Sequence, residues 1–333
     1  EETLARVIEI DAENIEDDEE IEDNLESIGQ NKDVYDFRRL LKAKSLTYRI
    51  PIQIILPHTY NEKIKKRMKT RPNSEGAIQD KATRAWNFFT ALYYKSGGIP
   101  WRIIRKSTEL QSCFIGISFF RNLQQTSYHT STAQIFNERG EGLIIRGGEA
   151  KRSPEDLQIH LSAEESEKIV TKSLFKYKQE HYTLPARVVI HKTSDYNQDE
   201  IDGIIAALRN AGIELFDLLS FSKSTLRLHR DGKYPPLRGT FWDIDDENKI
   251  LYTRGSVDFF ETYPGLYIPK SLRIKVSYSE QSTIHLANEI LSLTKMNWNN
   301  TQFDNSLPIT IKAARQVGDI LKYNFRWFVF VNS

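Results

Sequence analysis

Residues 112–120 read Ser-Cys-Phe-Ile-Gly-Ile-Ser-Phe-Phe, and this stretch decides the fold class. Its run of aromatic and β-branched side chains without a charge predicts a β-strand. Two further segments of strand character follow, at Thr132–Phe136 and Gly142–Arg146. Because the three segments are consecutive and closely spaced, we expect them to form a meander of neighbouring strands.

The chain after this meander alternates between helix and strand patterns. Ser162 and Glu165 have capping-box spacing and open a long helix. Asn197 and Glu200 open a second helix, which Gly212 ends. We expect strands at Ala186–Lys192, Ile213–Phe221, Thr240–Ile244, Lys249–Arg254 and Leu272–Tyr278, and helices at Thr283–Lys295 and Ile309–Tyr323. Three hairpin-type strands followed by helix, strand, helix and strand is the order of an RNase H-like core.

The chain before the meander predicts a strand, a helix and a strand. Residues 47–57 are rich in Ile and predict a buried strand, and the basic stretch Tyr60–Arg71 after them is expected to be helical. A longer helix follows, ended by Gly97-Gly98, with a strand starting at Ile99. The apolar side chains that recur at helical spacing are Ala82, Ala85, Trp86, Phe89, Leu92 and Tyr93, and of these we expect Trp86, Phe89 and Tyr93 in the core. This order resembles half of a Rossmann-like domain, so the whole chain is expected to be α/β.

Composition excludes several classes of protein. The chain of 333 residues has one cysteine, Cys113, which rules out an internal disulfide framework and a cysteine-rich zinc site and fits a reducing cytoplasm. We expect neither a membrane-spanning helix nor a secretory signal, because the chain has no suitable apolar run.

The net charge of +1 hides an asymmetry. Residues 1–36 carry 15 acidic and two basic residues, a net of −13, whereas residues 37–333 carry 44 basic and 30 acidic residues, a net of +14. A basic body attracts a polyanion such as nucleic acid, although solubility alone would also explain the excess. The acidic start is either a solvated tail or a strip that docks on a basic partner.

Six short segments carry a family resemblance: Lys95-Ser-Gly-Gly-Ile-Pro-Trp101, Phe114-Ile-Gly-Ile-Ser118, Val189-Ile-His-Lys-Thr-Ser194, Pro236-Leu-Arg-Gly-Thr240, Lys295-Met-Asn-Trp298 and Leu307-Pro-Ile-Thr-Ile-Lys-Ala-Ala-Arg315. Together they resemble the Argonaute family, in its short prokaryotic, catalytically inactive branch. No single segment is decisive, but their order and spacing over about 280 residues are specific. The resemblance implies an acidic segment (1–36), a Rossmann-like MID domain (37–105) that binds the guide 5′ end, and an RNase H-like PIWI domain (106–333).

The resemblance also implies that target cleavage has been lost. Active PIWI domains hold two divalent metal ions with acidic side chains. The matching positions here are Ser118, Thr193 and Arg315, of which two are poor metal ligands and one is a cation. We therefore expect no catalytic metal and no enzymatic activity. The alternative is a register slip that makes Asp195 a ligand, in which case the chain is an active Mg- or Mn-dependent nuclease that cuts guide-matched nucleic acid.

A guide 5′-phosphate would be held by convergent cations, an amide and backbone N–H groups. The resemblance places Lys95 in such a pocket, at the end of the long helix. The other residues assigned to it are Tyr60, Lys63, Lys66, Arg67 and Gln79. Without the resemblance, the basic stretch reads as a solvated helix and Lys95 as a cation favoured by the helix dipole. Some relatives bind Mg²⁺ at the guide 5′ end with a Gln one helical turn before the position of Lys95. Ala91 stands at that place here, so the resemblance leaves both alternatives, with and without Mg²⁺ at the guide 5′ end.

The partners follow from the same resemblance. Arg227, Arg230, Lys233 and Arg238 are assigned to a guide–target channel, with a solvated hairpin as the other interpretation. We expect a guide, RNA with a 5′-phosphate, a single-stranded DNA target, and an APAZ-domain effector that forms a heterodimer or higher oligomer. That effector would be a TIR or SIR2 NADase, or a nuclease, acting in prokaryotic antiviral defence.

A third interpretation of the chain is a Rossmann-like enzyme that acts on a small molecule. The sequence contains no GxGxxG fingerprint that would support it.

Overall fold

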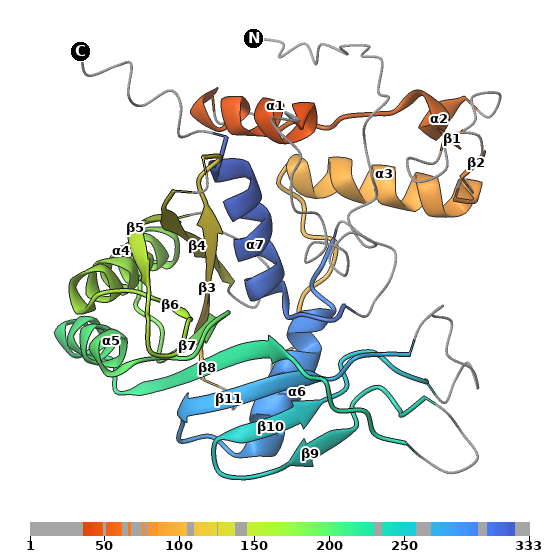
Figure 1. The fold of residues 1–333 in the computed structure, drawn as a ribbon. Coiled ribbons are helices and arrows are strands. Elements are labelled where there is room, and N and C mark those ends of the chain that lie inside the picture. Colours follow the sequence, from red (N-terminus) through yellow and green to blue (C-terminus); the bar gives the residue numbers. More distant parts are fainter. Residues whose placement is uncertain are drawn as a thin grey trace, which may run out of the picture. The chain divides into compact units, whose positions relative to one another are not determined.

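The computed structural model describes residues 36–48, 51–61, 66–67, 75–76, 79–104, 110–124, 126–136, 145–229, 235–257, 268–298 and 305–323. The chain divides into two compact units, and the division falls between Leu92 and Tyr93 within one long helix (Figure 1). No helix among the described residues combines the length and apolar character needed to cross a bilayer.

The first unit (residues 1–92) is mainly helical in its described part. Helix α1 (Phe37–Ser45) begins after Asp36, whose carboxylate accepts a hydrogen bond from the backbone N–H of Arg39 at 3.2 Å. The elements that follow are the 3₁₀ helix η1 (Leu46–Tyr48), α2 (Pro57–Tyr60), the antiparallel pair β1 (Lys66–Arg67) and β2 (Glu75–Gly76), and α3 (Lys81–Lys95).

The two strands predicted on either side of α3 are not formed. Residues 51–56 alternate between exposed and half-buried side chains, as a strand would, but they have no regular structure and pair with no strand in the described part of the chain. Residues 98–104 also lack regular structure. A strand needs a neighbour for its ladder hydrogen bonds, and Pro51 and Pro57 remove a donor at each end of the first segment.

Two other predictions for this half are also wrong. The basic stretch Tyr60–Arg71 is not one helix, because Lys66–Arg67 form a strand. Trp86, Phe89 and Tyr93, which were expected in the core, are 46%, 65% and 55% exposed. Helical periodicity gives the face that is apolar, but it does not supply a partner to cover that face.

The second unit (residues 93–333) is built on a nine-stranded sheet with the order β6-β5-β4-β3-β7-β8-β11-β10-β9 (Figure 1). The strands are β3 (Ser112–Arg121), β4 (Tyr128–Phe136), β5 (Ile145–Arg152), β6 (Ile159–His160), β7 (Arg187–Lys192), β8 (Leu215–Lys223), β9 (Phe241–Asp243), β10 (Asn248–Leu251) and β11 (Leu272–Tyr278). β3, β4 and β5 form the predicted antiparallel meander, while β7 and β8 are parallel to β3. β3, the first strand of this sheet in the sequence, therefore lies in the interior of the sheet. Both the mixed α/β class and the RNase H-like order of elements are confirmed.

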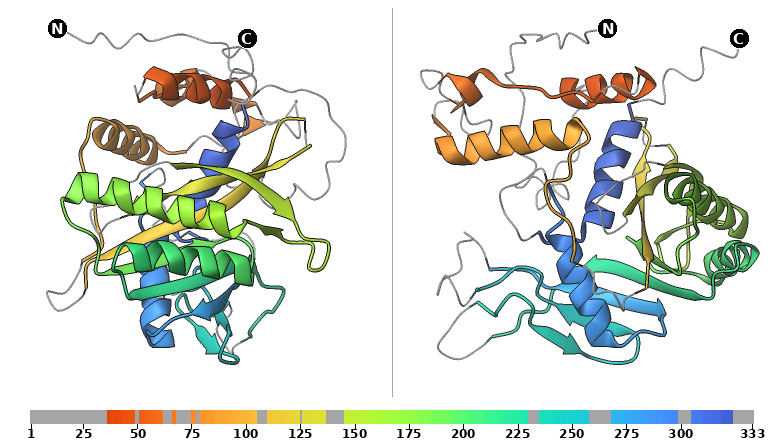
Figure 2. Two further views of the ribbon diagram at one scale, coloured as in Figure 1. Left: turned by 90° about the vertical axis from the view of Figure 1, so that its left-hand side faces the viewer. Right: turned by 180° about the vertical axis from the view of Figure 1, so that it is seen from behind.

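Helices cover both faces of this sheet (Figure 2). They are α4 (Ala163–His181), α5 (Gln198–Asn210), α6 (Thr283–Thr294) and α7 (Ile309–Leu321). Val188 and Ile190 of β7 pack in one core with apolar residues of α4 and α5, whereas Val189 packs in a second core with residues of α6 and α7. Successive side chains of a strand point to opposite faces, so β7 is buried on both sides.

Candidate nucleic-acid interface

Ser118 and the backbone of Thr193 are neighbours across the two central parallel strands. β3 pairs with β7 in a register that sets Gly116 opposite His191 and Ile117 opposite Lys192. The backbone N–H of Thr193 donates to the carbonyl of Ile117 at 3.2 Å and so continues the ladder by one residue. Ser118 is 2% exposed. Two positions 75 residues apart in the sequence are thereby brought side by side.

Helix α7 lies over β3 on the same face as Ser118. The helix approaches Gly116 so closely that a Cβ there would overlap the carbonyl oxygen of Thr310. Four residues further along the strand, Phe120 packs in a small cluster with Val317 and Leu321 of the helix. Strand residues two apart share a face, so Ser118 faces the middle of α7, between these two contacts.

Arg315 lies on the flank of α7 that faces β7. Ile311, one turn earlier on that flank, packs in the same core as Val189 of β7. A helix rises about 1.5 Å per residue and a strand about 3.3 Å, so Arg315 reaches the level of Ser118. The strand register makes Ser118 and Thr193 neighbours, and the convergence of Arg315 on them stays a prediction.

His191 fixes the start of α7 against the sheet. Its Nδ1 lies 2.8 Å from the hydroxyl of Thr310, and its ring meets the ring of Phe221 edge to face at 4.8 Å between centroids. Burial, helped by the charge of Arg187, lowers the pKa of His191 to about 3. The imidazole is therefore neutral at physiological pH.

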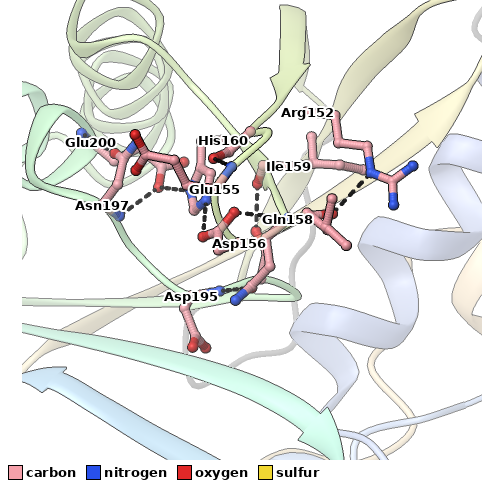
Figure 3. Close-up of polar contacts among 12 residues, drawn as sticks. Arg152, Glu155, Asp156, Gln158, Ile159, His160, Asp195, Asn197 and Glu200 are labelled. Atoms are coloured by element: carbon pink, nitrogen blue, oxygen red, sulfur yellow. Dashed lines mark hydrogen bonds and ion pairs between the residues drawn. The ribbon is translucent and has the colours of Figure 1, made fainter.

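The loop after Thr193 is held by the β5–β6 hairpin (Figure 3). The hydroxyl of Ser194 donates to the carbonyl of Ile159 at 2.7 Å, and the backbone N–H of Asp195 donates to the side-chain oxygen of Gln158 at 2.7 Å. These bonds fix where the side chains of the loop point, including that of Asp195.

The carboxylate of Asp195 points to β8 and β11. It accepts a hydrogen bond from the hydroxyl of Ser220 at 2.8 Å and pairs with Lys275 at 3.5 Å. Burial alone would raise the pKa of Asp195, but these two partners outweigh it and hold the pKa below its ordinary value. Lys275 was missed from the sequence; the signal available was the alternation of charged and apolar side chains in Leu272–Tyr278.

A buried ionic cluster supports the other face of β7. The ammonium of Lys192 lies 2.5 Å from the carboxylate of Glu200, and both side chains are about 1% exposed. Glu200 also accepts from the backbone N–H groups of Leu161 and Asn197, at 2.8 and 3.1 Å, and His160 lies between Glu200 and Asp156 (Figure 3). The Asn197–Glu200 capping box read from the sequence is formed. The cluster joins β7, β6 and the start of α5.

The donor set at this place does not fit a divalent metal ion. Hard cations in RNase H-like sites need several carboxylate oxygens. Ser118 and Thr193 offer hydroxyl groups and Arg315 a cation, while Asp195 is paired with Lys275. Within the described ranges, no three His, Cys, Asp or Glu side chains are grouped closely enough to hold a metal ion.

The residues assigned to the guide 5′-phosphate pocket are only partly described. Tyr60 ends α2 and is 63% exposed. Lys66 and Arg67 form β1, Gln79 is exposed and accepts from Asn87 at 3.3 Å, and Lys63 lies outside the described residues. Lys95 ends α3 and belongs to the second unit, whereas the other described members belong to the first. Their convergence in a pocket stays a prediction.

The residues assigned to the guide–target channel are also only partly described. Arg227 is exposed, and its guanidinium donates to the carbonyls of Ser224 and Leu226 at 2.9 Å. Arg238 is half-buried and donates to the carbonyl of Leu291 and the hydroxyl of Thr294 at the end of α6. Arg230 and Lys233 lie outside the described residues. The channel assignment stays a prediction.

Fold and site together define an RNase H-like α/β protein whose central strands carry Ser118 and lead to Thr193. No protein-family model matches the chain. In sequence it is similar to the protein argonaute of Aquifex aeolicus, with 22% identity over 293 residues that make up 86% of this chain and 36% of the relative.

Solved structures with a similar fold are also Argonautes. Clostridium butyricum Argonaute, bound to a guide DNA and a 19-mer target DNA, has a TM-score of 0.62 and 21% identity, covering 87% of this chain and 35% of that one. A. aeolicus Argonaute has a TM-score of 0.58 and 20% identity, covering 85% and 37%. Marinitoga piezophila Argonaute, in complex with a 5′ OH guide RNA, has a TM-score of 0.52 and 14% identity, covering 72% and 36%. The chain is thus similar to Argonautes in sequence and in fold, and it spans about a third of their length.

Proposed function

We propose that this chain binds a guide strand and uses it to recognise complementary single-stranded DNA without cutting it. The observation that carries the proposal is the similarity to Argonautes in sequence and fold, together with a central site that lacks carboxylates at Ser118, Thr193 and Arg315. Base pairing reads the target sequence, and the basic residues 37–333 attract the phosphate backbone.

The proposed guide is RNA with a 5′-phosphate, held by Lys95 and the residues grouped with it. One relative holds a guide DNA and another a 5′ OH guide RNA, so the end chemistry of the guide has to be measured for this chain. Titration of labelled 5′-phosphate and 5′-hydroxyl RNA at fixed salt is expected to give at least tenfold tighter binding of the phosphorylated RNA. Equal affinity for the two ends contradicts a 5′-phosphate pocket.

A Mg²⁺ ion at the guide 5′ end would depend mainly on the phosphates of the guide, because the buried methyl group of Ala91 offers no oxygen ligand. We expect EDTA to change guide affinity less than twofold. A larger loss, restored by Mg²⁺ and absent for 5′-hydroxyl RNA, would place an ion in the pocket.

Guided recognition without cleavage is tested with the loaded protein. We expect it to retain complementary DNA and release a scrambled strand, and to yield no product in Mg²⁺ or Mn²⁺. Guide-matched cutting that disappears in Asp195→Asn would establish a nuclease and overturn the proposed loss of cleavage. Binding that ignores the guide sequence would overturn guided recognition.

We propose that target binding activates an effector protein, because a chain that does not cut DNA needs another protein to act on the invader. The proposed effector contains an APAZ region and a TIR or SIR2 NADase, or a nuclease, and serves defence against invading DNA in the cytoplasm. Purification from native cells, with mass spectrometry of the bound protein, tests this partner. NAD consumption or DNA degradation is expected to rise with complementary target and not with scrambled DNA.

A further inference from the structure

Arg315 is a half-buried cation on α7. Within the described ranges its guanidinium makes no hydrogen bond and no ion pair. Arg187, by contrast, is buried against Asp217 and Glu289 at 2.6 Å each. A guanidinium that is partly removed from water gains from an oxygen anion that accepts its N–H groups in a fork. Because Arg315 has no partner in the part of the chain that the structure describes, its guanidinium is available to an anion from outside the chain.

The surroundings of Arg315 favour an anion and oppose a cation. The course of α7 over β3, from Gly116 at Thr310 to Phe120 at Val317, sets Arg315 at about the level of Ser118, and both Ser118 and Thr193 carry hydroxyl groups and no charge. The nearest acidic residue in the sequence of the loop, Asp195, is directed to Ser220 and Lys275. The positive charge of Arg315 is thus not cancelled by a carboxylate from β3 or from the loop after β7.

A phosphodiester is the anion that the proposed function brings to this place. In metal-dependent RNase H-like sites, the metal ions supply positive charge to the phosphate being cut. Arg315 offers a fixed positive charge at the corresponding level of the sheet, and a guanidinium, unlike a metal ion, does not bind and activate water. An Arg–phosphate contact is a charge-assisted, bidentate hydrogen bond, which suits binding without hydrolysis.

We propose that Arg315 binds one backbone phosphate of the target strand, and that this contact takes the place of a metal ion at the central site. The inference rests on the proposed function, since it needs a guide–target duplex in place. It assigns a binding role to a residue that otherwise only signals the loss of cleavage.

The test couples one side chain to one phosphate. Target DNAs are made with a single neutral methylphosphonate linkage moved along the paired region, and each is bound to the guide-loaded chain. With the natural protein, one linkage is expected to lower affinity roughly tenfold, the size of a charge-assisted hydrogen bond. With Arg315→Gln, affinity for the unmodified target falls by a similar factor, and the same linkage then costs less than twofold.

Matched variants separate this contact from general electrostatics. Lys322→Gln removes one positive charge next to the same helix, where Lys322 pairs with Asp319 at 2.8 Å, and is expected to leave the methylphosphonate profile unchanged. Arg315→Lys keeps the charge but loses the fork, and should retain part of the coupling. Thermal unfolding of each variant shows that it is folded.

The outcomes are distinct. Coupling of Arg315 to one target linkage supports the inference. A profile that is the same for the natural protein and Arg315→Gln, or coupling found only when the neutral linkage is in the guide, overturns it. If guided binding itself is absent, the proposed function fails before the methylphosphonate series begins.

Discussion

The Nδ1 atom of His191 and the hydroxyl oxygen of Thr310 lie 2.8 Å apart and join the end of β7 to the first turn of α7. These residues are 119 positions apart in the sequence. Both are buried, with 1% and 0% of their surface exposed. The contact sets the height of α7 above the sheet and thereby the position of Arg315.

Stability is expected to fall in acid because of His191. Its pKa is about 3 in the folded chain and about 6.5 when unfolded, so only the unfolded chain takes up a proton between these values. The contribution is complete above about pH 6.5 and is lost, at up to about 1.4 kcal/mol per pH unit, as the pH falls toward 3. Urea unfolding from pH 7.5 to 4.5 measures the slope, which His191→Asn should reduce.

Thr310→Val is the matched variant for this slope. It removes the hydrogen-bond partner but leaves His191 buried, so it should lower stability at every pH and preserve the steepness. A pH profile of His191→Asn as steep as that of the natural chain would contradict the assignment.

Glu200→Gln should destabilise the second unit by roughly 3–5 kcal/mol, because it leaves the buried charge of Lys192 without a counter-ion. The backbone N–H of Leu161 donates to Oε1 of Glu200 and that of Asn197 to Oε2, so the single amide oxygen of Gln keeps one of these bonds, and the loss combines the ion pair with one backbone hydrogen bond. The double variant with Lys192→Met should recover much of the loss. Additive losses in denaturant unfolding would argue against coupling of the two residues.

Gly116→Ala should cost more than an ordinary glycine substitution. The new methyl group would overlap the backbone of Thr310, and a close-packed interface can respond only by moving α7. We expect a loss above about 2 kcal/mol, against about 1 kcal/mol for Gly212→Ala, which has a φ of +70° but open space around it. Equal melting temperatures for the two variants would show that α7 is not held tightly.

Cys113 should be inert in the folded chain. It is fully buried, and burial raises the pKa of its thiol well above the usual range, so almost no thiolate forms. Iodoacetamide or a disulfide reagent at pH 8 is expected to label it only as fast as the second unit opens. Because it is the one cysteine of the chain, the labelling rate in rising urea measures that opening. Rapid stoichiometric labelling without denaturant would contradict the burial.

The sequence predicts the second unit well because its signals are local. The strand at Leu272–Tyr278 has the predicted bounds. Helix α5 begins at the capping box of Asn197 and ends before Gly212, as expected. In the first unit, residues 47–57 carry an apolar pattern but no partner strand among the described residues, and periodicity alone cannot supply one.

The candidate site is only partly readable from the sequence. Ser118, Thr193 and Arg315 were placed together by resemblance; the register of β3 and β7 makes the first two neighbours, while the place of Arg315 beside them stays a prediction. The partners of charged side chains were not predictable, because they come from distant segments. Asp195 and Lys275 are 80 residues apart, and Arg238 reaches Thr294 across 56.

The central place of β3 has a consequence for how the chain is made. During synthesis β3 emerges first, but its parallel neighbour β7 follows only after residue 187, and α7, which covers Gly116 and Phe120, comes after residue 309. Until then a strand of apolar side chains has an open edge and an open face, a state that invites aggregation. Nascent chains and truncated chains that end before α7 should therefore depend on chaperones. The yield of folded protein should be higher when cells express it slowly at low temperature.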